Sequence, residues 1–375
     1  MYRLLSLVLL SMVFIRPVQA QGGEGESPGG AVVCDPSIYP RYVAECLPAG
    51  PAAQMDRWAE EGIPMPPRPF GGFPPDPSLS DLPYRYFRLN PEPVPIFTSI
   101  PANPNDPGQQ IMPAGFVYVT YVQRVDTGKG IYYLTPSGWW VPGRGSRVSE
   151  YSRFQGLEFS RPPETSFGWT FETVPVRAAP DFNAPVVRTA TTYTVVQIYG
   201  TQIVNGHAWN RIGINEWVEA RKVAQVIPAT TPPEGVTNGR WIDVNLEEQT
   251  LAVYDNNRLI FATVIASGLE PFWTRPGLFQ IYQKKEIENM RGSDPSDFYY
   301  LENVPWTMYY DGARALHGAY WRTRFGYPQS HGCVNLSVGD AHWLFNWAKE
   351  GDWVYIYDPS GKTPTDPALY PSWGY

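Results

Sequence analysis

The stretch that decides the fold is residues 314–335, which read RALHGAYWRTRFGYPQSHGCVN. Two His-Gly pairs bracket a loop rich in aromatic and basic residues, and the second pair leads directly into Cys333. A thiol becomes a strong nucleophile only as a thiolate, and a nearby imidazole is the usual group that removes its proton. His317 and His331 are both candidate bases. The stretch therefore predicts a nucleophilic cysteine site, with Gly332 leaving backbone N–H groups open to a developing oxyanion.

Two short motifs in this stretch have a constrained spacing, and they read His317-Gly318 and Ser330-His331-Gly332-Cys333-Val334-Asn335. Together they resemble the signature of the L,D-transpeptidase catalytic domain. The resemblance implies that His317 is the base for Cys333 and that the Gly318 carbonyl orients its imidazole. It leaves a supporting role for His331, either in hydrogen bonding within the loop or in shaping the site.

The remaining motif positions have implied roles as well. The N–H groups of Gly332 and Cys333 would form an oxyanion hole, while Ser330 and Asn335 would support the loop. Two arginines between the motifs, Arg322 and Arg324, are candidates for binding substrate carboxylates, because arginine contacts them in a bidentate manner. For either arginine alone, a solvated basic loop is an equally good interpretation.

The resemblance implies acyl transfer in two steps. Cys333 would attack the carbonyl of an L,D peptide bond in a peptidoglycan stem peptide and expel the terminal D-residue, and an amine of a neighbouring stem would then resolve the thioester. Water in place of the amine would make the protein an L,D-carboxypeptidase. An inactive scaffold that binds the cell wall is the alternative from a different functional class, and the intact His and Cys set argues against it.

Two other chemistries could use the same residues. A zinc site could use His317, His331 and Cys333, but no Cys-x-x-Cys pair accompanies them. A papain-like protease also pairs cysteine with histidine, but the sequence typical of that family around its cysteine is missing here. We therefore expect neither a metal nor another cofactor.

The composition points to strands rather than helices. Of 375 residues, 40 are proline, 15% are aromatic and only 17% are charged. Such a chain favours strands, turns and proline-bearing loops, and its length suggests about two or three domains. The formal net charge is −7, and there is no run of basic residues, so we expect no nucleic-acid partner.

Residues 1–20 have the pattern of a secretory signal peptide. Arg3 supplies the positive start, residues 4–15 are apolar, and residues 18–20 contain the small side chains of a cleavage site. The apolar run is shorter than the roughly 20 residues that a membrane span needs. No later stretch is apolar enough to span. We expect an exported protein in the periplasm or at the cell surface, without a transmembrane span after removal of the signal.

Export changes how the three cysteines are interpreted. Cys34 and Cys46 lie close together near the predicted mature N-terminus, and an oxidising compartment would join them in a disulfide. Cys333 is then left as a free thiol, which is unusual in an exported protein and favours a reactive role.

The segment before the catalytic motifs divides into three predicted parts. Residues 21–83 are rich in glycine and proline, which predicts a semi-rigid stalk. Residues 84–160 and 165–228 share an order of features: a Val-Pro segment, a β-branched strand, a turn with Gly, and a closing Trp-Val strand. This internal repeat resembles bacterial SH3-like domains, which implies two small β-barrels with a possible contact to the cell wall.

Residues 239–359 are predicted to form the L,D-transpeptidase catalytic domain. Residues 241–246 and 249–254 alternate between apolar and polar, as strands of a hairpin do. Ser337 and Asp340 have capping-box spacing at the start of one helix, which Gly351 would end. Residues 360–375 are a C-terminal tail. The predicted fold is mainly β, with two small SH3-like barrels followed by a β-rich catalytic domain with one main helix.

Overall fold

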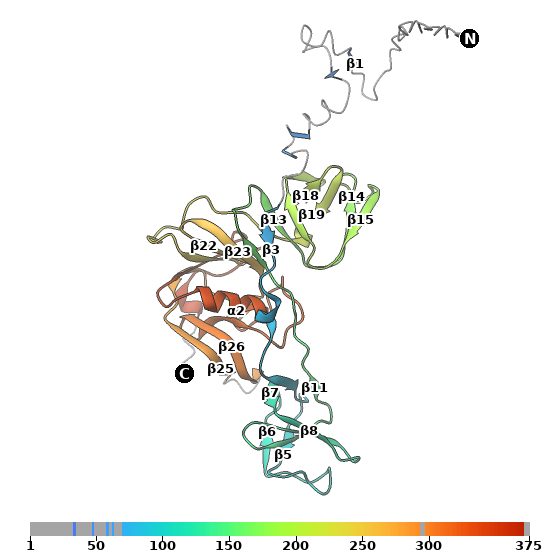
Figure 1. The fold of residues 1–375 in the computed structure, drawn as a ribbon, viewed down its shortest axis with the longest axis vertical. Helices are drawn as coiled ribbons and strands as arrows, with labels where there is room; N and C mark the ends of the chain where they lie inside the picture. The colour runs from blue at the N-terminus through green and yellow to red at the C-terminus, as the bar shows by residue number, and fades with distance from the viewer. Residues whose placement is uncertain are drawn as a thin grey trace, which may run out of the picture. The chain divides into compact units, whose positions relative to one another are not determined.

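The computed structural model describes residues 33–34, 47–48, 58–59, 62–63, 70–292 and 297–370 (Figure 1). The chain divides into two compact units, residues 1–67 and residues 68–375, and the second contains the predicted site. Strands dominate the second unit, whose described residues contain a single α-helix, α2 (Val338–Trp347). The prediction of a mainly β chain with one main helix is confirmed.

One seven-stranded sheet contains the hairpin predicted at residues 241–254. Its strands, in spatial order, are β24 (Gly277–Gln280), β29 (Trp353–Tyr357), β21 (Trp241–Asn245), β22 (Thr250–Asp255), β23 (Arg258–Val264), β12 (Leu157–Phe159) and β3 (Gly72–Phe73). Strand β21 pairs antiparallel with β22 and parallel with β29. Ile242, Val244, Leu251 and Val253 are fully buried in the core, as the alternation predicts.

A second seven-stranded sheet carries the two His-Gly motifs. Its strands, in spatial order, are β11 (Arg147–Val148), β4 (Arg85–Arg88), β7 (Phe116–Tyr121), β26 (Tyr299–Asp311), β27 (Arg314–Gly318) and β28 (Val334–Leu336), with β25 (Gln283–Arg291) also paired to β26. The first motif ends β27, and the second comes directly before β28. These two strands are parallel neighbours, so the pairing brings the two motifs together.

Helix α2 packs against strands of both sheets around one core (Figure 1). It begins as the sequence predicts, because the Ser337 hydroxyl accepts the N–H of Asp340 at 3.2 Å. The Asp340 carboxylate is buried and accepts a hydrogen bond from the N–H of Gly156, 2.8 Å away. Asp340 thus also joins the helix to the segment that precedes the predicted catalytic domain.

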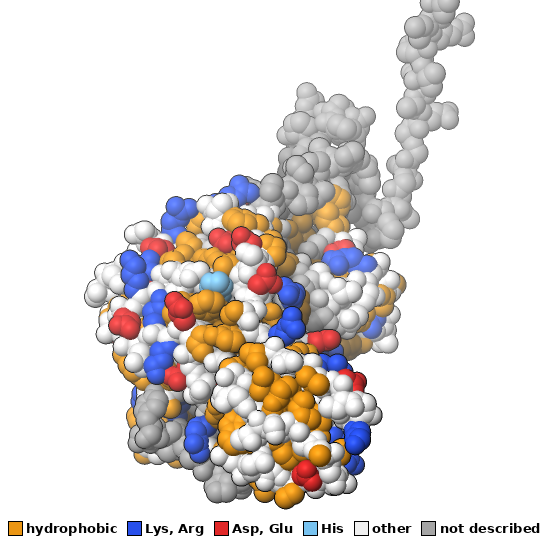
Figure 2. All heavy atoms as spheres, turned by 60° about the horizontal axis from the view of Figure 1, so that its bottom comes forward, with side chains coloured by type: hydrophobic (Ala, Val, Ile, Leu, Met, Phe, Trp, Pro, Cys, Tyr) orange, Lys and Arg blue, Asp and Glu red, His pale blue; other side chains and the backbone are white. Residues whose placement is uncertain are grey.

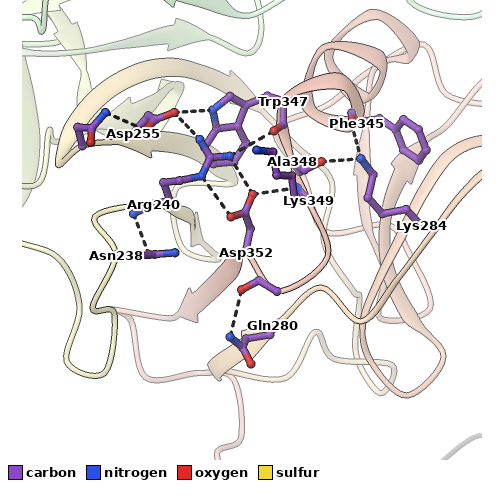
Figure 3. Close-up of polar contacts among 12 residues, drawn as sticks. Asn238, Arg240, Asp255, Gln280, Lys284, Phe345, Trp347, Ala348, Lys349 and Asp352 are labelled. Carbon is purple, nitrogen blue, oxygen red and sulfur yellow. Dashed lines mark hydrogen bonds and ion pairs between the residues drawn. The ribbon is translucent and has the colours of Figure 1, made fainter.

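A cluster of charges ties the end of α2 to the start of β21 (Figure 3). Arg240 forms ion pairs with Asp255 and Asp352, and its guanidinium lies 4.1 Å from the centre of the Trp347 ring. The Lys284 ammonium donates to two carbonyl groups at the end of the helix, at 2.5 and 2.6 Å. The C-terminus of a helix carries a partial negative charge, so both cations stabilise it.

The predicted first barrel, residues 84–160, shares its strands with the two large sheets. Its other strands are β5 (Val94–Ile96), β6 (Gln110–Met112), β8 (Gln123–Asp126), β9 (Ile131–Leu134) and β10 (Trp140–Pro142), in two small sheets. Strands β4, β7 and β11 instead extend the sheet that carries the His-Gly motifs, and β12 extends the other. The unpaired backbone groups at the edge of a sheet pair readily with an added strand. The prediction treats residues 84–160 as a separate domain and therefore does not include this pairing. The SH3-like assignment stays a prediction.

Residues 165–228 form two small sheets, with one core cluster of their own and a second cluster shared with strands β12, β21, β22 and β23. The three-stranded sheet contains β16 (Val195–Ile198), β13 (Ser166–Thr170) and β20 (Val223–Val226). The five-stranded sheet contains β15 (Val186–Ala190), β14 (Val174–Arg177), β19 (Glu216–Glu219), β18 (His207–Gly213) and β17 (Gly200–Val204). The segment is β-rich, and both its status as a separate domain and its likeness to SH3-like barrels stay predictions.

Several short elements complete the described chain, and some predictions fall outside it. The short elements are β1 (Val33–Cys34), β2 (Leu47–Pro48) and the 3-10 helices η2 (Pro77–Ser80), η3 (Ala220–Lys222) and η5 (Pro367–Leu369). The signal peptide, most of the stalk, the side chains of Cys34 and Cys46, and residues 371–375 lie outside the described residues.

Two surface properties bear on partners. Among the described residues, no helix combines the length and the hydropathy that a membrane crossing requires. On the face shown in Figure 2, acidic and basic side chains are interspersed among hydrophobic and neutral ones.

Candidate functional site

A cavity of about 270 Å³ opens beside Cys333. Its lining residues are Phe116, Met290, Asp297, Tyr299, Leu301, His317, Trp321, Arg322, Gln329, Ser330, His331, Cys333 and Asn335. Strand β7, the β25–β26 hairpin, β27 and the loop before β28 all contribute to it. The structure therefore brings most of the sequence-predicted site residues to one place.

The register between β27 and β28 explains why His317 and Cys333 share this cavity. His317 is paired with Asn335 across the two parallel strands. Paired residues face the same side of a sheet, and residues two apart in an extended chain do so as well. Cys333 lies in the bend directly before β28, and His317, Cys333 and Asn335 all line the cavity.

His317 is buried, and its two ring nitrogens have different partners. Nδ1 lies 3.2 Å from the Gly318 carbonyl oxygen, which can only accept, so Nδ1 carries the proton. Nε2 lies 3.0 Å from the side-chain nitrogen of Asn335 and accepts from it. Burial lowers the pKa of His317 to about 4, against the opposing effect of the Gly318 bond. The ring is therefore neutral at pH 7, with Nε2 as its basic atom.

Arg322 fixes the orientation of Asn335 and hence the tautomer of His317. Its Nε donates to the Asn335 side-chain oxygen at 2.5 Å, which leaves the amide nitrogen to face His317. The other guanidinium nitrogens donate to the Gln329 side chain at 3.1 Å and to the Gln329 carbonyl at 2.6 Å. Burial lowers the pKa of Arg322 to about 10, which leaves it charged at pH 7. Arg322 thus orders the site from within, whereas the sequence suggests either a substrate contact or a solvated basic loop.

Cys333 is partly exposed to the cavity, and its sulfur lies 3.8 Å from the Ala313 carbonyl oxygen. Burial raises the pKa of the Cys333 thiol, while a hydrogen bond from the Ala315 backbone and the charge of Arg314 oppose this rise. The resting sulfur is consequently a thiol at pH 7.

The loop around Cys333 is held by two hydroxyl groups. The Ser330 hydroxyl accepts the Gly332 N–H at 3.1 Å and donates to the Cys333 carbonyl at 2.5 Å. The Thr274 hydroxyl donates to the Gly332 carbonyl at 2.9 Å. Gly332 has φ +111°, in the region that favours glycine. Ser330 therefore supports the loop as predicted, but in this structure it engages the Gly332 N–H that was expected to face an oxyanion.

His331 differs from His317 in burial and partner. Its Nε2 lies 2.7 Å from a carboxylate oxygen of Asp297, and both side chains are substantially exposed. Its ring packs against Phe272 and Tyr299, with centroids 4.7 and 4.9 Å apart. This environment fits the supporting role that the sequence suggests, because His331 shapes one rim of the cavity.

Arg324 is exposed and does not line the cavity, so only Arg322 of the two predicted arginines belongs to it. In the ranges 70–292 and 297–370, no group of three or more His, Cys, Asp or Glu side chains could hold a metal ion.

The sequence interpretation missed several residues of the cavity. Trp321 and Gln329 lie inside the quoted stretch, where their presence between the motifs was a usable signal. Asp297, Tyr299 and Phe116 come from other segments, and no local pattern connects those segments with Cys333. Only strand pairing brings them there.

The chain was compared with known families and structures. The L,D-transpeptidase catalytic domain family, YkuD, matches residues 239–356. Among solved structures, an L,D-transpeptidase from Stackebrandtia nassauensis is 26% identical with a TM-score of 0.28, and the match covers 35% of this chain. The match spans 60% of that Stackebrandtia chain. A search of curated proteins gives no match.

Two further solved structures are similar. The catalytic domain from the Enterococcus faecium L,D-transpeptidase is 25% identical with a TM-score of 0.30, over 33% of this chain and 100% of that one. An L,D-transpeptidase from Mycobacterium smegmatis is 18% identical with a TM-score of 0.31, over 56% of this chain and 93% of that one. The family match covers both His-Gly motifs and Cys333, and it confirms the resemblance noted in the sequence. Residues 239–356 of this chain therefore belong to the L,D-transpeptidase catalytic domain family.

Proposed function

We propose that this protein is an exported L,D-transpeptidase that transfers an acyl group from a peptidoglycan stem peptide through a thioester on Cys333. One observation carries the proposal. Cys333 shares a cavity with a buried, neutral His317 whose tautomer is fixed by Gly318 and Asn335, inside the segment that matches the family.

The first half-reaction follows from the resting protonation states. The Cys333 sulfur attacks the carbonyl carbon of the L,D peptide bond, while its proton moves to Nε2 of His317. Nε2 accepts from Asn335 in the resting state, so this bond must lengthen as the proton arrives. The imidazolium then protonates the leaving nitrogen of the terminal D-residue, and a thioester remains on Cys333.

The second half-reaction reverses the proton path. An incoming amine gives its proton to neutral His317 as it attacks the thioester carbonyl, and the thiolate leaves and recovers that proton. With water as the acceptor, the same steps release the free acid, so the acceptor decides between transpeptidase and carboxypeptidase outcomes. A cell-wall contact by residues 84–228 belongs to this proposal as well.

The test is mass spectrometry of the mature protein incubated with a stem tetrapeptide. We expect a covalent acyl adduct on Cys333 that has lost the terminal residue, and none in the Cys333→Ser variant, because a serine hydroxyl is far less acidic than a thiol. Addition of an amine acceptor should give a cross-linked peptide, whereas its absence should give hydrolysis. An adduct on another residue, or turnover by Cys333→Ser, would contradict the assignment.

Export is tested separately. Residues 1–20 support cleavage after Ala20. We expect the N-terminal sequence of the exported protein to begin at Gln21. Thiol counting on the non-reduced protein should find one free thiol, at Cys333, if Cys34 and Cys46 are joined as predicted.

A further inference from the structure

The strand β26 has two halves with different partners. Its outer half, residues 299–301, pairs in parallel with β7, and its inner half pairs with β27, which carries His317. Asn303 lies between them with φ +52°, which bends the strand at this point. The outer half therefore connects β7 to the part of β26 that pairs with β27 and its His317.

The side chains of the outer half alternate between two cavities. Asp297, Tyr299 and Leu301 line the Cys333 cavity. Phe298, Tyr300 and Glu302 line a second cavity, of about 290 Å³. This alternation is that of an extended strand whose opposite faces are both covered.

Phe116 reaches the Cys333 cavity because of its place in this pairing. It is the register partner of Tyr299, and both residues line that cavity. Its N–H donates to the Phe298 carbonyl at 3.0 Å. The Arg88 guanidinium lies 5.0 Å from the centre of its ring, and the Tyr118 ring lies at the same distance. Arg88 of β4 and Tyr118 of β7 therefore pack against the Phe116 ring.

Residues 84–121 also hold the bend in β26. The Tyr86 hydroxyl donates to the Asn303 carbonyl at 2.9 Å, and the Asn303 side chain donates to the Thr120 hydroxyl at 3.1 Å. The Glu302 carboxylate accepts from both the N–H and the hydroxyl of Thr120, at 2.6 and 2.9 Å. These contacts satisfy polar groups that a bend would otherwise leave unpaired.

The cavity is lined by both polar and apolar side chains. Its polar residues include Gln329, Ser330 and Asn335. Its apolar residues are Phe116, Met290, Leu301 and Trp321. Apolar lining of this kind contributes affinity by removing aliphatic surface from water.

We propose that Phe116, which lies outside the family domain, is a specificity-determining residue that contacts an aliphatic side chain of the acyl donor. The β4–β7 segment then supplies a substrate-contacting residue to the catalytic site and is not a separate domain. This inference rests on the proposed function, since it assumes that Cys333 is acylated by a peptide donor.

The first test compares two truncations at the same strand junction. Phe116→Ala removes a ring from the Cys333 cavity, and Phe298→Ala removes one from the second cavity. We expect Phe116→Ala to lower kcat/KM for acylation by a stem tetrapeptide roughly tenfold, mainly through a higher KM, because the donor loses apolar contact. Phe298→Ala should stay within about twofold of the wild type.

Two controls separate contact from folding. Iodoacetamide is too small to depend on contact with the apolar lining residues. Its rate of alkylation of Cys333 should therefore be unchanged in Phe116→Ala. Phe116→Leu, which keeps an apolar side chain, should recover most of the acylation. If Phe116→Ala acylates like the wild type, or if Phe298→Ala is equally impaired, the role assigned to Phe116 is wrong. If the wild type forms no acyl adduct, the proposed function itself fails.

The second test detaches β7 from β26. A Cβ at Gly115 would lie 2.3 Å from the Phe298 carbonyl oxygen, and the φ of Gly115 is +141°. Gly128 also has a positive φ, +75°, but a Cβ there would meet nothing within 4 Å. We expect Gly115→Ala to lower kcat/KM for acylation by at least tenfold, with iodoacetamide alkylation retained, and Gly128→Ala to change neither. Equal acylation by the two variants would overturn the inference.

Discussion

The two histidines near Cys333 have the same neighbour in the sequence, glycine, but opposite environments in the fold. His317 lies on a strand, is 2% exposed, and bonds only to neutral partners through its two nitrogens. His331 lies in a loop, is substantially exposed, and faces the carboxylate of Asp297. Burial without a counter-charge lowers the pKa of His317 and favours its neutral ring. A base must be neutral before it accepts a proton, so the environment favours His317.

The largest expected effect tests this contrast directly. We expect His317→Ala to lower the rate of Cys333 acylation by about 10²- to 10⁴-fold, the usual contribution of a general base. Single-turnover mass spectrometry with a stem peptide measures this rate. His207→Ala, a substitution of an exposed histidine in residues 165–228, is the control and should change nothing. A rate within threefold of the wild type for His317→Ala would remove it from the mechanism.

The second effect is on stability as a function of pH. In the unfolded chain His317 protonates near pH 6.5, but in the fold its pKa is about 4. The stability associated with the neutral ring is fully present above pH 6.5 and is lost as the pH falls toward 4. The loss is about 3 kcal/mol. His317→Gln does not titrate and should lack this component.

Urea unfolding of the wild type and His317→Gln between pH 7 and 4 measures that difference. Other groups contribute equally to both proteins, so only the divergence of the two curves is informative. Parallel curves would mean that His317 is not buried in the neutral form.

The third effect concerns the two arginines between the motifs. The Arg322 guanidinium makes three hydrogen bonds, which the single ammonium group of a lysine cannot reproduce. We therefore expect Arg322→Lys to lower the free energy of unfolding by about 2 kcal/mol. Arg324→Lys changes an exposed side chain and should alter it by less than about 0.5 kcal/mol. Chemical denaturation measures both. A rise in KM for Arg322→Lys at unchanged stability would instead restore its suggested role as a substrate anchor.

The smallest effect is expected for the exposed histidine. His331→Ala removes the contact with Asp297 and one rim of the cavity, so we expect acylation to fall by less than about tenfold. Asp297→Asn should have a similar or smaller effect, since it keeps the shape and removes the charge. If His331→Ala is as impaired as His317→Ala, the roles of the two histidines need to be reassigned.

Local patterns predicted the elements that depend on nearby residues. The alternation in residues 241–254 predicted a hairpin, because strand periodicity is visible over six residues. Ser337 and Asp340 predicted the start of α2, because capping is a contact across three positions. The pairing of β7 with β26 was not predicted, because the two strands are far apart in the chain and their register depends on the assembled sheet.

The sequence by itself determined the candidate nucleophile, the two candidate bases and the family of residues 239–356, since these depend on residue identity and short spacings. Only the tertiary structure decided that His317 is buried and neutral, what fixes its tautomer, and that Arg322 bonds to Asn335. It also brought Phe116 into the cavity from outside the family domain. The physical reason is that burial and cross-strand contacts arise from surfaces that meet only in the folded chain, so no local stretch of sequence encodes them.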